Sequence, residues 1–243
     1  MNSKLRVTAV AGVAALALLS AGAVLSQDKG GAKGKGQNQD AAKAGASSPS
    51  SQAADAARMA HQLARYGDAK KDALALITAA KVKKETGEQE LKAERSTDQP
   101  KGKKPEATAK PGADIYTVEA ILERARAAAG GRKDLLALAD DVAKSGGRGA
   151  TGGPRTAHTV VCSNCTDRFR IFFDGGLPAR VAISGDGDSR LDLYVYDENG
   201  NNICRQVGPG DDARCAWTPS WTGAFTIRVV NYGIANQYRL WTN

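Results

Sequence analysis

Most of the predicted β-structure lies in residues 179–243, which read ARVAISGDGDSRLDLYVYDENGNNICRQVGPGDDARCAWTPSWTGAFTIRVVNYGIANQYRLWTN. Within this stretch, residues 191–196 carry aliphatic side chains at every second position, which is the period that a half-buried strand needs. Residues 197–201 follow as Asp-Glu-Asn-Gly-Asn, and Asn-Gly tolerates the positive φ angles of a tight hairpin turn. We therefore predict a β-hairpin whose second strand covers residues 202–206.

Further alternating runs lie on both sides of this hairpin. They predict strands that include residues 169–173, 181–183, 225–230 and 238–241. Turn-forming residues separate these strands at intervals of roughly eight to twelve residues, which is typical of an antiparallel sandwich. Aromatic residues are concentrated in the same region, since only Tyr66 and Tyr116 precede residue 158. Residues 158–243 are therefore predicted to form a small β-domain with a modest core.

Three motifs of this domain carry a resemblance to a known family. They are GDGDSRLDLYVYDENGN at residues 185–201, TPSWTGAFTIRVVNYG at residues 218–233, and NQYRLWTN at residues 236–243. Together they resemble the bacterial pre-peptidase C-terminal domain, a small sandwich of jelly-roll type that is usually appended to secreted proteases. The resemblance covers about the last third of the chain. It implies a jelly-roll-like fold for residues 158–243 and nothing for residues 27–157.

The N-terminal residues 1–26 have the features of a secretory signal peptide. Lys4 and Arg6 precede a short apolar core at residues 7–19, and small residues follow it. The apolar core is short for a membrane span. We therefore expect a periplasmic or secreted protein with no membrane span after the signal peptide is cleaved.

The rest of the chain divides by composition and helical spacing. Residues 27–55 are too poor in large apolar side chains to offset their chain entropy, so we predict a disordered tether there. Apolar residues at helical spacing predict two helical hairpins, and polar or Gly-rich stretches predict linkers. The hairpins are predicted at residues 56–92 and 114–145, and the linkers at residues 93–113 and 146–157. The predicted fold class is therefore a multidomain α+β chain: a helical region followed by an antiparallel, jelly-roll-like β-sandwich.

The cysteines predict disulfide bonds. All four lie in the predicted β-domain, at Cys162, Cys165, Cys204 and Cys215. An even number of cysteines in an exported protein favours disulfides, and of the three possible pairings we favour the two that are closest in sequence. A bridge between the last two cysteines would contribute roughly 2–3 kcal/mol in the chain-entropy model. The first two also form a C-x-x-C motif, although the helix that usually starts at a redox-active motif is missing.

The charge of the chain is unevenly distributed. The formal net charge is +8, but residues 158–243 contain 8 Arg, no Lys and 9 acidic residues, so the excess of positive charge precedes them. Such an excess can either favour anionic envelope surfaces or simply keep the chain in solution. Export and the lack of aromatic residues among the basic ones argue against nucleic acid as a partner.

Three aspartates form the candidate metal site. Asp186, Asp188 and Asp192 lie in and after a glycine-rich loop, where their carboxylates offer the hard oxygen ligands that Ca²⁺ prefers. The pattern matches only the opening of an EF-hand loop, and the competing interpretation is a solvated acidic turn. Calcium is the only cofactor that the sequence suggests.

Four aromatic residues form the candidate binding face. Tyr194, Tyr196, Trp217 and Trp221 belong to the predicted sandwich or its loops. Aromatic side chains exposed on a sandwich suit the recognition of a polymer or a peptide. The competing interpretation is that they pack in the core or at its edge.

No catalytic pattern is present in the sequence. The two histidines, His61 and His158, have no neighbouring nucleophile signature, and neither G-x-S-x-G nor H-E-x-x-H occurs. The sequence therefore favours a non-enzymatic binding or accessory protein of the cell envelope. It would recognise a protein or polymer through a disulfide-stapled sandwich. The alternatives are an accessory subunit of a secreted hydrolase and a redox protein that uses Cys162 and Cys165.

Overall fold

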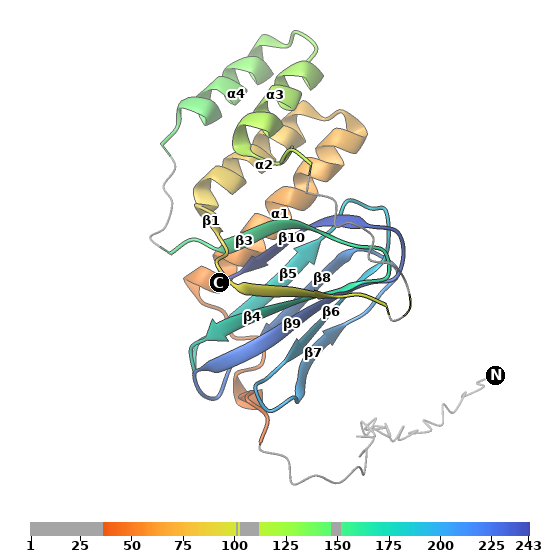
Figure 1. The fold of residues 1–243 in the computed structure, drawn as a ribbon. Helices are drawn as coiled ribbons and strands as arrows, with labels where there is room; N and C mark the ends of the chain where they lie inside the picture. Colours follow the sequence, from red (N-terminus) through yellow and green to blue (C-terminus); the bar gives the residue numbers. More distant parts are fainter. Residues whose placement is uncertain (1–35, 101, 103–111, 147–151) are drawn as a thin grey trace, which may run out of the picture. The chain divides into compact units, whose positions relative to one another are not determined.

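The computed structural model describes residues 36–100, 102, 112–146 and 152–243, which belong to one of the two units of the chain, Lys35–Asn243 (Figure 1). The predicted signal peptide lies outside the described residues. The elements in chain order are η1 Ala41–Lys43, α1 Pro49–Lys70, α2 Ala73–Thr86, β1 Gln89–Glu90, β2 Glu94–Asp98, α3 Val118–Ala128, α4 Lys133–Lys144, β3 Arg155–Val161, β4 Thr166–Phe173, β5 Ala179–Ser184, β6 Leu191–Tyr196, β7 Asn202–Gln206, β8 Asp212–Trp217, β9 Gly223–Asn231 and β10 Asn236–Thr242.

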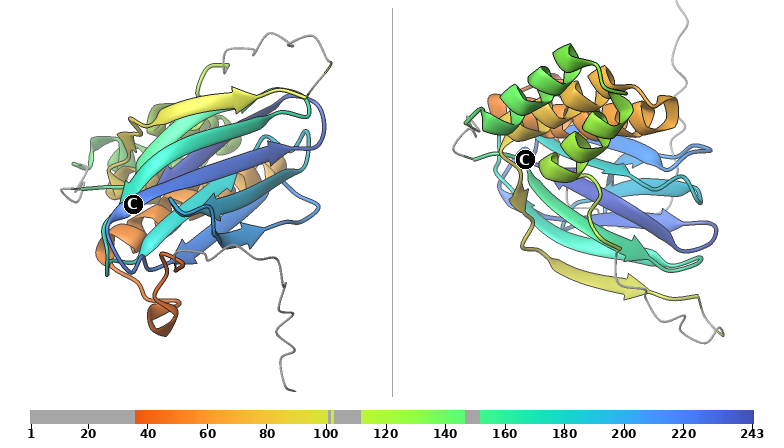
Figure 2. Two further views of the ribbon diagram at one scale, coloured as in Figure 1. Left: turned by 60° about the horizontal axis from the view of Figure 1, so that its bottom comes forward. Right: turned by 90° about the horizontal axis from the view of Figure 1, so that it is seen from above.

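The strands form a sandwich of two five-stranded sheets (Figures 1 and 2). The first sheet has the order β1-β3-β10-β5-β8, and the second has the order β2-β4-β9-β6-β7. Strands β3 to β10 pair with one another in antiparallel fashion throughout, and they alone form two four-stranded sheets in a jelly-roll arrangement. The predicted α+β fold class with a β-sandwich is therefore confirmed.

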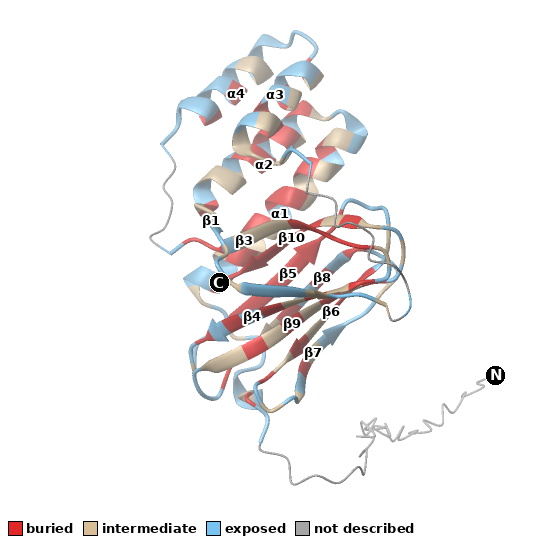
Figure 3. Cartoon of the chain, viewed as in Figure 1, coloured by how far each residue is buried: buried red, intermediate tan, exposed pale blue. Residues whose placement is uncertain are grey.

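The sandwich core is built from the inward positions of both sheets. In β6, Leu191, Leu193 and Val195 are buried, whereas Tyr194 and Tyr196 are partly exposed, as the period of two predicts. The hairpin turn after β6 also forms as predicted: Gly200 has a φ of 83°, and the amide of Asp197 donates to the carbonyl of Asn201. The same alternation along β9 is visible in Figure 3.

Four helices pack together beside the first sheet. Their shared core contains Leu76, Ile77, Ile121 and Leu122 from α2 and α3, with smaller side chains from α1 and α4. Helix α1 lies against β5 and β10, where Ala57 packs with Ala182 and Trp241. None of the described helices combines the length and apolar character needed to cross a membrane.

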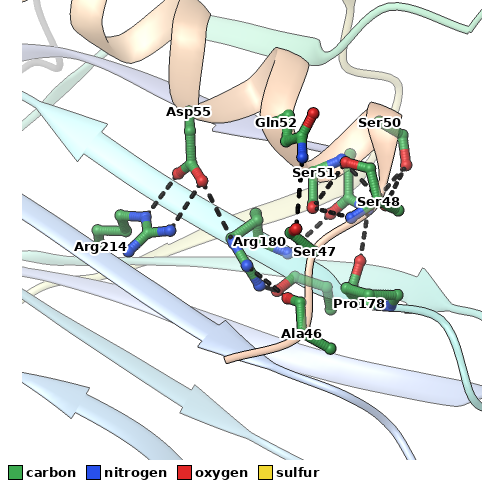
Figure 4. A network of polar contacts seen from close by, with 12 residues as sticks. Ala46, Ser47, Ser48, Ser50, Ser51, Gln52, Asp55, Pro178, Arg180 and Arg214 are labelled. Atoms are coloured by element: carbon green, nitrogen blue, oxygen red, sulfur yellow. Dashed lines mark hydrogen bonds and ion pairs between the residues drawn. The ribbon is translucent and has the colours of Figure 1, made fainter. Parts of the chain in front are cut away.

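Charged contacts fix α1 to the first sheet (Figure 4). The Asp55 carboxylate accepts hydrogen bonds from the Arg214 Nε and Nη2 atoms at 2.5 and 2.7 Å, and from the Arg180 Nε atom at 3.4 Å. The Arg180 Nη2 atom also donates to the carbonyl of Ala46 at 2.6 Å. Helix α1 begins at Pro49 because the Ser48 side chain caps it and forms a capping box with Ser51.

Two stretches predicted to be unstructured carry secondary structure instead. The predicted tether reaches residue 55, but α1 begins at Pro49, and Asn38 is fully buried against the sandwich. The predicted linker starts at residue 93, but residues 94–98 form β2 at the edge of the second sheet. A polar edge strand needs only backbone hydrogen bonds on one side. Its lack of apolar alternation therefore hid it from the sequence prediction.

Both disulfides that the sequence favours are present. Cys162 and Cys165 are joined in the turn between β3 and β4, with 5.2 Å between their Cα atoms. Cys204 on β7 and Cys215 on β8 are joined across the two sheets, with 5.9 Å between their Cα atoms. The second bridge ties the edge strands of the sandwich together.

Removing the bridge between β7 and β8 should destabilise the fold. We expect the double variant Cys204→Ala and Cys215→Ala to lose about 2 kcal/mol of unfolding free energy, because the unfolded chain regains the freedom of the closed loop. Urea denaturation of the purified chain measures this. The Cys162→Ala and Cys165→Ala pair, which opens a shorter loop, should lose less. Equal stability of the first variant and the wild type would contradict a stabilising role.

Candidate functional site

The outward face of the second sheet carries a row of basic side chains. The strand register places Arg168 of β4 opposite Arg228 of β9, Arg228 opposite Tyr194 of β6, and Tyr194 opposite Arg205 of β7. Directly opposite residues of antiparallel strands project from the same face of a sheet. Their chain neighbours Phe169, Ile227 and Val195 are buried in the core, so the row faces outward. We call these four residues the arginine row.

The arginines of this face are only partly neutralised. Arg168 forms an ion pair with Asp98 of β2. In the part of the chain that the structure describes, Arg170 and Arg228 form no ion pair, although Glu94 of β2 lies directly opposite Arg170. The Arg228 Nε atom is buried without a hydrogen bond. The guanidinium groups of Arg170 and Arg228 lie over aromatic rings instead, at 4.7 Å from the ring centre of Phe172 and 5.7 Å from that of Tyr196. The face therefore retains positive charge that can attract an anion.

This charge has an energetic cost in the folded protein. Arg168 and Arg228 are directly opposite each other, and like charges in that position destabilise an antiparallel pair. A threonine or valine at either position would suit the strand better. A local arrangement that disfavours the fold is a reason to look for a binding role.

A hollow of about 480 Å³ lies beside the arginine row. It is lined by Arg168, Arg170, Tyr196, Asp197, Glu198, Gly200, Ala224, Thr226 and Arg228. The basic residues come from β4 and β9, and the acidic residues come from the hairpin turn after β6. The hollow therefore has a basic wall on the sheet and an acidic wall at the turn.

The acidic wall is occupied by hydrogen bonds from within the protein. The backbone amide of Asn38 donates to Asp197 Oδ2 at 2.9 Å, and the Asn38 Nδ2 atom donates to Glu198 Oε2 at 3.3 Å. Burial would raise the pKa of Asp197, but hydrogen bonds from Asn201 and from backbone amides lower it below its ordinary value. Burial would also raise the pKa of Glu198, but the hydrogen bond from Trp221 helps to lower it below its ordinary value. Both carboxylates thus stay ionised but are engaged internally.

The predicted aromatic binding face is only partly assembled here. Tyr194 and Tyr196 lie on the outward face, with near-parallel rings whose centres are 6.4 Å apart. Burial and a hydrogen bond with Tyr232 raise the pKa of Tyr194 to about 12, so its hydroxyl stays protonated. Trp221 is 41% exposed in the loop before β9, and its Nε1 atom donates to Glu198 Oε1 at 2.5 Å.

Trp217 does not belong to this face. It is 1% exposed and packs in the sandwich core against Phe173 and Phe225, with ring centres 4.9 and 5.2 Å away. Its place at the end of β8 points it inward, whereas Trp221 follows in a loop. The competing interpretation, core packing, therefore applies to Trp217.

Two of the three candidate calcium ligands, Asp186 and Asp192, have their carboxylates engaged in separate contacts. Asp186 accepts from the amide of Asp188 at 3.1 Å and from the amide of Gln237 at 2.8 Å. Asp192 is 1% exposed, and Arg190 donates to both of its carboxylate oxygens at 2.8 Å. Among the described residues, no group of three or more His, Cys, Asp or Glu side chains is placed to hold a metal ion. Calcium binding stays a prediction from the sequence.

The C-x-x-C pair and the histidines lie away from this face. Cys162 and Cys165 are buried in a turn between strands, whereas reactive cysteines are partly exposed in electropositive surroundings. His61 is buried on α1, in ring contact with Tyr116 and Trp241. His158 lies on β3 of the first sheet.

Most of the arginine row was not predicted as a site. A signal was present: the alternation in residues 167–173, DRFRIFF, places Arg168 and Arg170 on the face opposite the core residues Phe169 and Ile171. The alignment of Arg168 with Arg228 and Arg205 depends on the pairing of strands that are distant in sequence. That pairing is not encoded locally.

Comparisons with known proteins found likenesses to solved structures, and each of those described below covers little more than a third of this chain. No protein-family model matches the chain, and a search of the curated proteins found no match. A periplasmic inhibitor of g-type lysozyme from Aeromonas hydrophila is 14% identical, covers 37% of this chain and 84% of its own, and has a TM-score of 0.30. The pre-peptidase C-terminal domain of a Bacillus anthracis collagenase is 12% identical, covers 35% of this chain and 84% of its own, and has a TM-score of 0.29.

A carbohydrate-binding module, TmCBM61, was solved with β-1,4-galactotriose bound. It is 16% identical, covers 36% of this chain and 83% of its own, and has a TM-score of 0.22. Likenesses at these identities and TM-scores assign no function to this chain.

Proposed function

We propose that this chain is an exported, non-enzymatic binding protein of the cell envelope, which recognises an acidic protein or polymer through the outward face of its second sheet. The arginine row carries the proposal. It sets like charges directly opposite each other on an accessible face, where they cost folding stability and can be offset by a bound anion.

The rest of the site is consistent with an acidic partner. Arg170 adds a further guanidinium group beside the row; among the described residues it forms no ion pair, although Glu94 lies directly opposite it. The carboxylates closest to the row are already engaged within the protein: Asp98 by Arg168 and Asp192 by Arg190. Asp197 and Glu198 at the turn are held by Asn38 and Trp221. An approaching anion therefore meets guanidinium groups that retain free N–H donors.

Disulfide bonds support the export part of the proposal. Cys162–Cys165 and Cys204–Cys215 include every cysteine of the chain. Disulfides persist in secreted and periplasmic proteins and are rare in the cytosol. The predicted signal peptide gives the same compartment.

Retention on isolated cell envelopes tests the proposal. We expect the double variant Arg168→Ala and Arg228→Ala to bind at least about 10-fold more weakly than the wild type, because each lost contact is a charge-assisted hydrogen bond. Raising the salt concentration should weaken wild-type binding. Co-sedimentation of residues 27–243 with washed envelopes measures both effects.

A matched control separates the site from net charge. The double variant Arg126→Ala and Arg132→Ala also removes two positive charges, but from exposed ion pairs on or beside the helices. It should bind like the wild type. If both double variants lose the same affinity, the binding is non-specific and the proposed site is wrong.

A further inference from the structure

We infer that the ligand of the arginine row is an acidic polysaccharide; this inference rests on the proposed function and names its ligand class. The inference depends on three properties of the face: its length, the scarcity of exposed hydrophobic side chains along its strands, and the combination of guanidinium groups with tyrosine rings.

The length of the row requires an extended ligand. Arg168 and Arg205 lie on β4 and β7, which are separated by β9 and β6 in the second sheet. Three strand spacings correspond to about 14 Å. A single small anion cannot engage both ends, whereas a chain with repeated acid groups can lie across the strands.

The composition of the face differs from that of an interface with an apolar core. Such a core is more apolar than the polar rim around it, although tyrosine and arginine are also enriched there. Within the strands of the second sheet, Phe172, at 61%, is the only exposed large hydrophobic residue among those described, and it lies at the end of β4. Val230 of β9 is half-buried on the same face. The middle of the face consists of arginine, tyrosine and threonine side chains, so it offers no apolar core.

The same side chains suit a sugar polymer with acid groups. Tyr194 and Tyr196 present partly exposed rings, on which the C–H faces of sugars can pack, and their hydroxyl groups can hydrogen-bond. Thr226 lies between Arg170 and Tyr196 in the neighbouring row and adds another hydroxyl. The guanidinium groups of Arg168 and Arg228 can bind carboxylate or sulfate groups with two parallel hydrogen bonds.

Binding to defined polymers tests the ligand class. Isothermal titration of residues 27–243 would use polygalacturonate, dextran sulfate, uncharged dextran, poly-glutamate and an oligo-thymidine strand. We expect polygalacturonate or dextran sulfate to bind, with the tighter of the two identifying the acid group as carboxylate or sulfate, and dextran not to bind. Arg168→Ala with Arg228→Ala should weaken this binding by at least about 10-fold.

The tyrosines provide the discriminating variant. Tyr194→Ala with Tyr196→Ala should weaken binding to the acidic polysaccharide several-fold while leaving any binding to poly-glutamate unchanged, because only the sugar rings pack on the tyrosines. Circular dichroism spectra and urea denaturation of both double variants would show that they remain folded.

The outcomes separate this inference from the proposed function. Arginine-dependent binding that is tighter to poly-glutamate or to oligo-thymidine than to either acidic polysaccharide would overturn the polysaccharide inference. Tighter binding to poly-glutamate would leave the proposed function standing. No binding to either acidic polysaccharide, together with arginine-dependent retention on envelopes, would also overturn the inference alone. Polysaccharide binding that is unaffected by the arginine variants would overturn both.

Discussion

Replacing Asp167 with alanine is expected to lower the free energy of unfolding by about 3–5 kcal/mol, the largest effect of any single change considered for this chain. The Asp167 side chain is 0% exposed. Its carboxylate accepts hydrogen bonds from the Tyr238 hydroxyl at 2.7 Å, from Thr97 Oγ1 at 2.6 Å, and from Arg95 Nη2 at 2.8 Å. One carboxylate thus joins β2, β4 and β10, which belong to both sheets.

The alanine variant leaves these partners without their acceptor. The Tyr238 hydroxyl is buried in the core, and Arg95 would lose its only acidic partner among the described residues. A buried polar group that loses its partner costs its full desolvation energy. Strand β2 should also become less firmly attached, because two of its side chains, Arg95 and Thr97, are hydrogen-bonded to the Asp167 carboxylate.

Urea denaturation of the Asp167→Ala and Asp98→Ala variants measures this effect. Asp98 also pairs an arginine between β2 and β4, but the pair is exposed, so its loss should cost less than about 1 kcal/mol. Equal destabilisation by the two substitutions would show that the Asp167 network does not stabilise the fold as described.

Acid should destabilise the packing of α1 on the first sheet through His61. Burial, together with the charges of Arg239, Arg65 and Lys83, lowers the pKa of His61 from 6.5 to about 3, although Asp114 acts in the opposite direction. Neither ring nitrogen of His61 has a hydrogen-bond partner. The folded protein therefore keeps this imidazole neutral.

The sign of the pH dependence follows from proton linkage. Below pH 6.5 the unfolded chain protonates His61, whereas the folded chain does not do so until about pH 3. The contribution of His61 to stability is therefore fully present above pH 6.5 and is lost as the pH falls from 6.5 towards 3. A full difference of one proton corresponds to about 1.4 kcal/mol per pH unit, or about 3 kcal/mol at pH 4.

Comparing variants isolates His61 from the carboxylates, which also lose stabilising interactions in acid. The unfolding free energy of the wild type should fall more steeply between pH 6.5 and 4 than that of His61→Leu. His158→Leu serves as the control, because His158 is the only other histidine and is less buried. Parallel pH profiles for the wild type and His61→Leu would contradict this account.

The bounds of two strands that have a local sequence pattern could be predicted correctly from the sequence. Strands β6 and β7 were predicted at residues 191–196 and 202–206, because alternation and the Asn-Gly turn are local properties. Strand β2 could not be predicted, since ERSTD has no apolar alternation and is attached through Asp167, about seventy residues further along the chain. Helix α1 begins early for a similar reason: small residues such as Ala54 and Ala57 are buried by close packing.

The residues of the candidate site also differ in how far a local sequence pattern could predict them. Tyr194 and Tyr196 could be placed on one face by the period of two, but Trp217 and Trp221 could not be told apart as core and loop residues. The arginine row needed the register between β4, β9, β6 and β7, which no local pattern encodes. The β-domain predicted at residues 158–243 also leaves out β1, β2 and the start of β3, which belong to the two sheets.

The central claim is that the outward face of the second sheet is the recognition surface. Titrating residues 27–243 with polygalacturonate and recording the arginine Nε–Hε signals by NMR tests it most directly. We predict that the signals of Arg168 and Arg228 shift progressively, while that of Arg214, which is paired with Asp55 on the first sheet, stays in place. Shifts at Arg214 without shifts at Arg168 and Arg228 would contradict the claim.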